Sequence, residues 1–515
     1  MGGTIKNVLF LVADEWRGDT LGLAGHPCVR TPHLESLAAD GTYFSRHYTQ
    51  ASPCGPAWAS MLTGQYLFNH RQVSNGTPLD ARFTNIALEA RKAGYVPALF
   101  GYTDTPRDPR PGAYEASGLE SREWICPGFE PVLPLLFAEK FEPWRQYLED
   151  KGYPVPGETG NFHELLALRH ADATSPFGPS IYKAEDSDTA YLTDGLIDYL
   201  REQKGKPWFA HFCCLKPHPP LVAPAPYHLQ YDPADVPLPV RRSHPSVEAQ
   251  QHPFQNWLLG AQSLFHHFQA ETAPEDVSEA DERAMRATYY GLCNEVDDNL
   301  GRILDYLKES GDYDDTLIVF CSDHGDQLGD HWLYGRQGYF EPNFHVPLIV
   351  RDPRREADAA RGRVVEQFTE MIDVMPTILE AMALSVPAQC DGYSLQPFLH
   401  GETPGDWRAA AHYECDFRDI RDQGDHVALD LPENECHFAV IRGDRGKYVH
   451  FPSLPPLYFD MHEDPHEFEN LADDPSRAPE VLTYAQMLLS LHARRADRAL
   501  THANLGFDGT KVGYS

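Results

Sequence analysis

The stretch VLFLVADEWRGD, residues 8–19, decides the fold. Its first half, residues 8–13, is a continuous apolar run, which is typical of a parallel strand buried on both faces. Asp14 and Glu15 follow directly, and acids at the carboxyl end of such a strand face the crevice where open α/β sheets bind ligands. The pattern predicts a metal site at this point, and a solvated turn is the alternative interpretation.

Three further apolar runs, at residues 95–100, 208–214 and 316–321, repeat this buried-strand pattern. Amphipathic stretches typical of helices lie between them, at residues 86–93, 188–202 and 286–309. Alternation of strand and helix predicts a doubly wound, mostly parallel α/β sheet. Residues 107–185, rich in proline and aromatic side chains, show no regular pattern and are expected to be irregular.

Beyond about residue 400 the pattern changes. Short strands are predicted at residues 437–442, 447–451 and 457–460, followed by a helix at 479–494. This predicts a larger α/β domain over residues 1–400 and a smaller α+β domain over residues 401–515, with a short antiparallel sheet, a helix and a tail. The polar tail, residues 506–515, is expected to act as an arm onto a neighbouring subunit of a homo-oligomer, a dimer or a tetramer.

Composition restricts the class of partner. The 515 residues carry 76 acidic against 43 basic side chains, a formal net charge of −33, which argues against nucleic acids and anionic membranes. A small anionic substrate stays compatible, because a metal ion or a few local cations set the field inside a pocket. No apolar stretch approaches the ~20 residues of a membrane span. Ten scattered cysteines without a CxxC pair, and a start without an apolar leader, predict a cytoplasmic protein with reduced thiols.

A second informative stretch is SPCGPAWAS, residues 52–60. Cys54 stands just ahead of a glycine and a proline, where the composition turns helical, so we expect it at the N-terminus of a helix. Backbone N–H groups and the positive end of the helix dipole favour an anion there and lower a thiol's pKa. The alternative interpretation is a cysteine packed under a turn, because free cysteines are among the most buried residues.

The fourth predicted strand is also followed by polar side chains, Asp323 and His324. Together with Asp14 and Glu15 they provide carboxylates and one imidazole, a set that suits Ca²⁺, Mn²⁺ or Mg²⁺. Neutral and cationic side chains in other loops are candidate partners of an anion: Asn75, Tyr102, Thr103, His218 and Arg336. Each of these interpretations has an alternative. Residues 323–325 could form a simple turn, His218 could make a structural hydrogen bond in the proline-rich loop, and Arg336 could be an ordinary surface arginine.

Taken together and in this order, several stretches resemble the type I sulfatases and phosphonate monoester hydrolases of the alkaline phosphatase superfamily. The resemblance covers essentially the whole chain. The motifs that carry it are residues 7–19, 52–60, 101–105, 217–220, 322–331 and 457–471.

The resemblance implies a catalytic domain over residues 1–400 and a metal-dependent hydrolase of sulfate esters that is promiscuous toward phosphonate monoesters and phosphodiesters. It implies one divalent ion, Ca²⁺ or Mn²⁺, held by Asp14, Asp323, His324 and Cys54, with Glu15 where most sulfatases carry a second Asp. In that family the cysteine is converted to formylglycine, whose hydrated form is the nucleophile. The remaining implied roles are catalytic for His218 and Arg336 and substrate-binding for Asn75, Tyr102 and Thr103.

One residue departs from the family's motif. Trp58 stands where the motif has an arginine that a formylglycine-generating enzyme reads and that braces the nucleophile. Three alternatives follow: modification despite Trp58, an unmodified Cys54 thiolate acting on the metal, or a homologue that binds anions without turning them over. A phosphonate monoester hydrolase or phosphodiesterase as the main activity is a further alternative.

Overall fold

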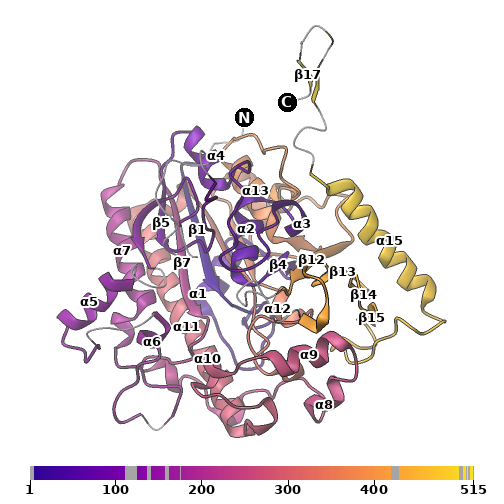
Figure 1. Cartoon of the computed structure of the whole chain (residues 1–515). Helices are drawn as coiled ribbons and strands as arrows, with labels where there is room; N and C mark the ends of the chain where they lie inside the picture. The colour runs from indigo at the N-terminus through magenta and orange to yellow at the C-terminus, as the bar shows by residue number, and fades with distance from the viewer. Residues whose placement is uncertain are drawn as a thin grey trace.

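An eight-stranded sheet, in the order β10-β2-β9-β8-β1-β7-β5-β6, lies at the centre of the computed structural model (Figure 1). The structure describes residues 5–110, 125–135, 141–156, 162–173, 175–418, 428–497, 503–505, 507 and 511–513. The strands span Asn7–Asp14 (β1), Thr42–Phe44 (β2), Pro97–Gly101 (β5), Glu130–Pro134 (β6), Phe209–Pro217 (β7), Thr316–Ser322 (β8), Leu348–Arg351 (β9) and Arg363–Val365 (β10).

The predicted doubly wound, mostly parallel sheet is confirmed. β9 pairs antiparallel with both β8 and β2, whereas the other pairings in this sheet are parallel. Among the described strands of the sheet, β9 is therefore the one that runs against the rest. β1, β7 and β8 are buried along their whole length, which explains why their sequences are largely continuous apolar runs.

Helices cover the sheet in two groups (Figure 1). One group is α1 (Pro32–Ala39), α7 (Asp188–Glu202) and α11 (Glu279–Ser310), and the other is α2 (Cys54–Thr63), α4 (Ile86–Lys92) and α13 (Val374–Ala381). Helix α11 begins earlier than predicted because the side chain of Ser278 caps it by accepting from the Asp281 N–H.

The prediction that residues 107–185 are irregular is wrong for part of this range. The structure places β6 there, together with α5 (Glu142–Asp150) and α6 (Phe162–Leu166). β6 lies at the edge of the sheet and exposes its first three residues, so it lacks the apolar run of a central strand. The two helices are short, and a short element buries few side chains and leaves a weak periodic signal.

A second sheet, in the order β15-β14-β13-β12-β4, builds the smaller C-terminal part and is covered by α15 (Ala478–Arg495). Its strands are Ala51–Ser52 (β4), Ala410–Asp416 (β12), His437–Gly443 (β13), Gly446–His450 (β14) and Leu457–Asp460 (β15). β4 comes from the N-terminal part of the chain and pairs parallel with β12, so this sheet reaches the start of α2, where Cys54 lies. The domain boundary at residue 400 stays a prediction.

Beyond α15, the strands β16 (Ala503–Leu505) and β17 (Lys511–Gly513) form an antiparallel pair, and β17 stands away from the rest of the chain in Figure 1. Most of the predicted arm, residues 506–515, lies outside the described residues, and its role in assembly stays a prediction. None of the helices that the structure describes has the length and apolar composition needed to cross a membrane.

Candidate active site

Strand register brings the predicted site residues together. β8, β1 and β7 are adjacent and parallel, with Ala13 opposite Ser322 and Asp14 opposite Pro217. Because the carboxyl ends of parallel strands meet at one edge of a sheet, Asp14 lies between the segment that carries Asp323 and the one that carries His218. Residues far apart in the sequence thus meet at one edge of the sheet.

The chain turns sharply after β1 at Glu15, whose φ of 67° is a left-handed conformation that costs a non-glycine residue energy. Three hydrogen bonds hold this turn. The Glu15 N–H donates to Asp323 Oδ1 (3.0 Å), the Trp16 N–H donates to Ser322 Oγ (2.8 Å), and Tyr289 Oη donates to the Glu15 carbonyl (2.6 Å). The turn separates the side chains of two adjacent acids, so that each faces a different group.

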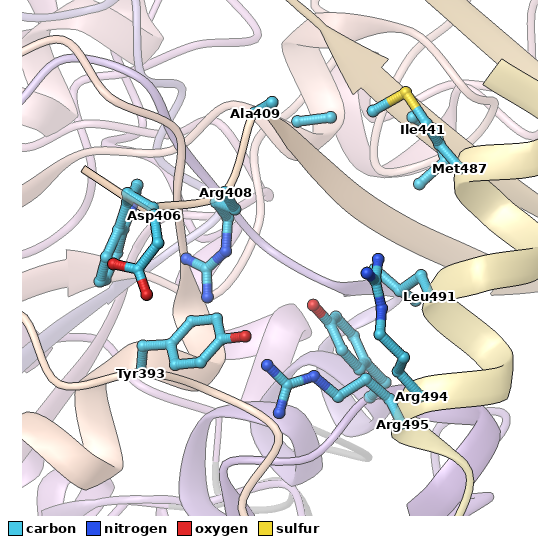
Figure 2. A pocket seen from close by; sticks show the side chains of 12 residues that line it. Tyr393, Asp406, Arg408, Ala409, Ile441, Met487, Leu491, Arg494 and Arg495 are labelled. Atoms are coloured by element: carbon cyan, nitrogen blue, oxygen red, sulfur yellow. The ribbon is translucent and has the colours of Figure 1, made fainter. Parts of the chain in front are cut away.

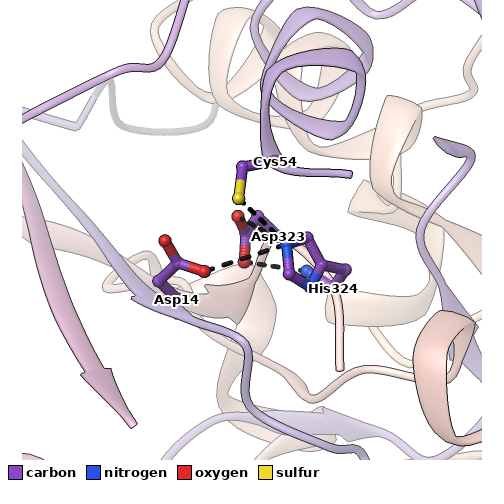
Figure 3. Close-up of side chains that lie close together, drawn as sticks. All are labelled: Asp14, Cys54, Asp323 and His324. Carbon is purple, nitrogen blue, oxygen red and sulfur yellow. Dashed lines mark hydrogen bonds and ion pairs between the residues drawn. The ribbon is translucent and has the colours of Figure 1, made fainter. Parts of the chain in front are cut away.

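Asp14, Cys54, Asp323 and His324 converge at the strand ends (Figure 3). One donor atom of each lies within 4.8 Å of the others. His324 Nε2 is 3.2 Å from Cys54 Sγ, 3.6 Å from Asp323 Oδ2 and 3.8 Å from Asp14 Oδ1. The predicted meeting of these four residues is therefore present in the geometry, with separations that a single cation can bridge.

The donor atoms of these residues are also available to coordinate a cation. Asp14 Oδ1 and Asp323 Oδ2 are buried and have no hydrogen-bond partner among the described residues. His324 Nδ1 donates to the Gly325 carbonyl (3.0 Å), which leaves the lone pair on Nε2 facing the cluster. Two buried carboxylate oxygens without donors are costly unless a cation neutralises them, so the donor set fits a divalent ion.

Burial sets the proton affinities of the cluster in the absence of a cation. Burial, with Asp323 nearby, raises the pKa of Asp14 to about 7, and burial raises the pKa of Asp323 to about 6. Burial also lowers the pKa of His324 to about 4. All three shifts disfavour the charged forms of the side chains, and a bound cation would reverse this preference for the carboxylates.

Cys54 is the first residue of α2, and the prediction that it starts a helix is confirmed. The expected lowering of its pKa is wrong for the site without a cation. Burial raises the pKa of the thiol well above its usual value, against the opposing charge of Arg336. Desolvation of the thiolate outweighs the dipole of the helix, because the residue is buried beside two carboxyl groups.

Glu15 is not one of the four converging residues, but with Asp14 and His218 it forms an adjacent group whose donor atoms also lie within 4.8 Å of one another, so its role as a metal ligand stays a prediction. Its Oε2 is 3.3 Å from both His218 Nε2 and Arg336 Nη1, and Arg336 Nη1 donates to His218 Nε2 (2.7 Å). His218 Nδ1 donates to the Pro219 carbonyl, so its Nε2 carries the lone pair. The Arg336 side chain is one quarter exposed, so solvent reaches part of it.

The three predicted substrate-binding residues make protein contacts in this structure. Tyr102 Oη donates to Asp14 Oδ2, Thr103 Oγ1 accepts from the Cys126 N–H (2.9 Å), and Asn75 Oδ1 accepts from the Gly55 N–H (2.9 Å). Tyr102 and Asn75 thus position the first strand's acid and the start of α2. Their contact with a substrate stays a prediction.

Trp58 is fully buried on α2, with its ring 5.4 Å from that of His211 and 5.8 Å from that of Tyr102. Its Nε1 has no hydrogen-bond partner among the described residues. An uncharged indole with one N–H cannot replace the fork of an arginine. The positive charge that acts on Cys54 instead comes from Arg336.

Sequence reasoning missed the residues that hold the loop carrying Arg336. Asp326 Oδ1 accepts from the N–H groups of Leu328 and Gly335 (both 2.8 Å), and Asp326 Oδ2 lies 2.7 Å from His267 Nε2. Ser52 Oγ donates to the Arg336 carbonyl (2.9 Å). Asp326 and Ser52 lie inside the family motifs at residues 322–331 and 52–60, and membership of those motifs is the only feature of the sequence that points to them.

A pocket of about 630 Å³ lies elsewhere, between α15 and the segment that leads into β12 (Figure 2). Its lining includes Tyr393, Arg408, Arg494 and Arg495 and none of the predicted site residues. The group of residues at the strand ends is therefore the candidate active site, because the converging donors lie there.

Comparison with solved structures agrees with this fold. The chain is similar to the phosphonate monoester hydrolase of Agrobacterium radiobacter, with a TM-score of 0.93 and 40% identity over 99% of this chain and 100% of that one. It is also similar to the phosphonate monoester hydrolase of Silicibacter pomeroyi, with a TM-score of 0.89 and 39% identity over 99% of both chains. Fold and site define a hydrolase of the sulfatase and phosphonate monoester hydrolase superfamily.

Sequence comparison narrows this class. The family model Sulfatase matches residues 6–384, and a model described as N-sulphoglucosamine sulphohydrolase, C-terminal, matches residues 329–494. The multifunctional alkaline phosphatase superfamily protein PehA of Trinickia caryophylli is 43% identical over 97% of both chains, and an arylsulfatase of Clostridium perfringens is 25% identical over 98% of both. The chain belongs to the sulfatase family of the alkaline phosphatase superfamily.

Removal of divalent ions should make stability depend on pH in a defined direction. The folded pKa values of Asp14 and Asp323, about 7 and about 6, exceed the value of about 3.9 in an unfolded chain. The folded protein without metal therefore binds more protons between about pH 4 and 7, so the contribution of these groups to the unfolding free energy falls as pH rises through that range. Thermal unfolding of chelator-treated protein at several pH values tests this.

A matched curve for the Asp14→Asn variant isolates the effect from other titrating groups. We expect a weaker loss of stability with rising pH in the variant, and none of this loss in wild-type protein saturated with a divalent ion. If the difference in stability between wild type and variant does not change from pH 4 to 7, the raised pKa of Asp14 would be contradicted.

Proposed function

We propose that this protein is a metal-dependent hydrolase of monoanionic esters, with phosphonate monoesters and phosphodiesters as its main substrates and aryl sulfates as secondary ones. The convergence of Asp14, Cys54, Asp323 and His324 carries the proposal. The names of two solved structures at 39–40% identity favour phosphonate esters, which reverses the order of the two activities expected from the sequence.

The charge of the site supports a monoanionic substrate. Arg336 is one quarter exposed and contacts His218, and the four donor residues suit one divalent ion. A sulfate ester or phosphonate monoester carries less negative charge than a phosphate dianion and needs fewer cations. One metal ion with one guanidinium is therefore a better match to a monoanion than to a phosphate monoester.

Asp14, Cys54, Asp323 and His324 would hold the ion. Mn²⁺ accepts carboxylate and imidazole donors, and Ca²⁺ would suit the site best if residue 54 offered an oxygen as hydrated formylglycine instead of a thiol sulfur. Such an ion lowers the pKa of a nucleophilic hydroxyl and withdraws charge from the ester oxygens. Tyr102 orients Asp14 through its hydroxyl, and the backbone of Glu15 and His324 orients Asp323. These contacts fix the carboxylates before a substrate arrives.

Arg336 and His218, which both lie against Glu15, would bind the transferred group. The guanidinium offers two N–H groups in a plane, which matches two oxygens of a tetrahedral anion. His218 Nε2 accepts from Arg336 and thereby orients it, while Glu15 balances the positive charge. If substrate oxygens displaced the Glu15 carboxylate, the Arg336 guanidinium would be free to bind the substrate.

Residue 54 would act as the nucleophile, as formylglycine or as the thiolate. Hydrated formylglycine carries two hydroxyl groups. One would attack the ester and displace its alcohol, and loss of the proton from the other would then expel the sulfate or phosphonate and restore the aldehyde. Modification requires that a formylglycine-generating enzyme accept Trp58 in place of arginine. Mass analysis of the peptide that contains residue 54 separates the alternatives, because the aldehyde is lighter than the thiol. A wholly unshifted peptide from active protein would exclude formylglycine.

Substrate preference is tested with purified protein, supplied with Ca²⁺ or Mn²⁺ and assayed on an aryl phosphonate monoester, an aryl phosphodiester and an aryl sulfate. We expect a higher kcat/KM on the phosphonate ester than on the sulfate ester. A higher value on the sulfate would restore the order expected from the sequence. No turnover of any of them would favour the non-catalytic anion-binding homologue.

Arg336→Ala should lower kcat/KM by roughly 10²–10³-fold, because it removes the charge that faces the transferred group. Arg336→Lys should retain more activity, since a point charge remains, but less than the wild type because the fork is lost. The matched control is Arg494→Ala, an exposed arginine on α15, for which we expect unchanged kinetics. Equal rates for Arg336→Ala and the control would remove this residue from the mechanism.

A further inference from the structure

We propose that His412, Glu414 and His492 form a second metal site, one that binds a zinc-like transition-metal ion. His412 and Glu414 are two residues apart on β12, so both side chains project from the same face of the strand. His492 reaches the same point from α15. One donor atom of each residue lies within 4.8 Å of the other two.

The separations match those between ligands of one metal ion. Glu414 Oε1 lies 3.3 Å from His412 Nε2 and 3.3 Å from His492 Nε2. Tetrahedral zinc with bonds of about 2.0–2.2 Å places its ligands about 3.3–3.6 Å apart, whereas an N–H···O bond is most often about 2.9 Å long. Both Nε2 atoms are buried and lack a hydrogen-bond partner among the described residues.

The ring of His412 is already in the form that binds a metal. Its Nδ1 lies 2.8 Å from the Val440 carbonyl, and a carbonyl only accepts, so Nδ1 carries the proton and Nε2 carries the lone pair. A carbonyl behind the ligating imidazole is the usual outer contact of a metal-binding histidine. The ring of His492 stacks on Phe68, with centroids 4.3 Å apart, which restricts its orientation.

The donor set and its exposure indicate the kind of ion. Two imidazole nitrogens and one carboxylate favour Zn²⁺ over Ca²⁺ or Mg²⁺, which prefer all-oxygen sites. His412 is fully buried and Glu414 nearly so, whereas the His492 side chain is 39% exposed and leaves an entry path from solvent. Three protein ligands leave a fourth position for water.

Such an ion would fasten α15 to the second sheet. Figure 1 shows α15 running along β12–β15, and β12 pairs with β4, two residues ahead of Cys54. The ion would therefore stabilise the C-terminal part and the strand that leads to the active-site helix. The competing interpretation is a cluster of His and Glu side chains that carries protons and no metal.

Full-length protein, stripped with a chelator and then titrated with Zn²⁺, tests the proposal. We expect the wild type to retain about one equivalent of zinc more than His492→Gln or Glu414→Gln, measured by elemental analysis after gel filtration. Zinc should also raise the melting temperature of the wild type more than that of either variant. The matched control is His462→Gln, an exposed histidine outside the group, which should keep the wild-type stoichiometry.

The Asp14→Asn variant separates this site from the one at the strand ends, because it should keep the equivalent that His492→Gln loses. His492 is partly exposed, so its variant decides the question if Glu414→Gln fails to fold. Co²⁺ in place of Zn²⁺ should give the visible absorption of a tetrahedral nitrogen–oxygen site in the wild type and not in His492→Gln. Equal zinc content of wild type and His492→Gln would overturn the proposal.

Discussion

Cys54→Ala should abolish turnover, with a fall in kcat/KM of about 10⁴-fold or more on every ester that the wild type cleaves. The substitution removes the nucleophile in both of its forms, and the losses seen for other covalent hydrolases are of this size. Cys54 is also one of the four converging donors, so weaker metal binding should accompany the loss. Steady-state kinetics together with metal analysis measure both effects.

The matched control is Cys28→Ala. Cys28 is half-buried and lies outside the cluster, so its variant should keep wild-type kinetics and metal content. Two outcomes would contradict the role of residue 54. One is retention of more than a tenth of the activity in Cys54→Ala, and the other is an equal loss in the control.

Asp14→Asn should lower activity by about 10³-fold and, at the same time, stabilise the protein without metal. The amide keeps the shape and an acceptor for Tyr102 but removes the charge that binds the cation. It also relieves the repulsion between two buried carboxylates at pH 8, where the pKa of Asp14 is raised to about 7 by burial and by Asp323. We expect a gain on the order of 1–3 kcal/mol in unfolding free energy.

Opposite signs for activity and stability distinguish this effect from simple damage to the fold. Thermal unfolding of chelated wild type and variant at pH 8 gives the stability, and metal titration gives the affinity. The control Asp19→Asn changes a half-exposed acid in the same loop, which pairs with Arg17, and should leave metal binding intact. A variant that binds the ion as tightly as the wild type would remove Asp14 from the site.

Strong local signals account for the parts of the fold that could be predicted. Central strands such as β1 and β8 are buried on both faces, so their apolar runs are visible in the sequence alone. β6 and β12 were missed for different reasons. β6 is an exposed edge strand, and β12 carries polar residues such as His412 and Glu414, which interrupt an apolar run although both are buried.

The residues that make up the site could be predicted from the sequence, whereas the contacts between them could be predicted less well. Residues at strand ends and in family motifs pointed to Asp14, Asp323 and His324, and these do converge. The grouping of Glu15 with His218 and Arg336 depends on the left-handed turn at Glu15. That turn is held by contacts with β8 and α11, which no local pattern of residues encodes.

By itself, the sequence determined the class of fold, the family resemblance and the inventory of chemically active side chains, because each is expressed in periodicity or in short motifs. Only the tertiary structure decided which acids share a cation, how burial changes the proton affinity of Cys54, and that His412, Glu414 and His492 meet between β12 and α15. Pairwise distances and desolvation depend on segments hundreds of residues apart, and they exist only once the chain has packed.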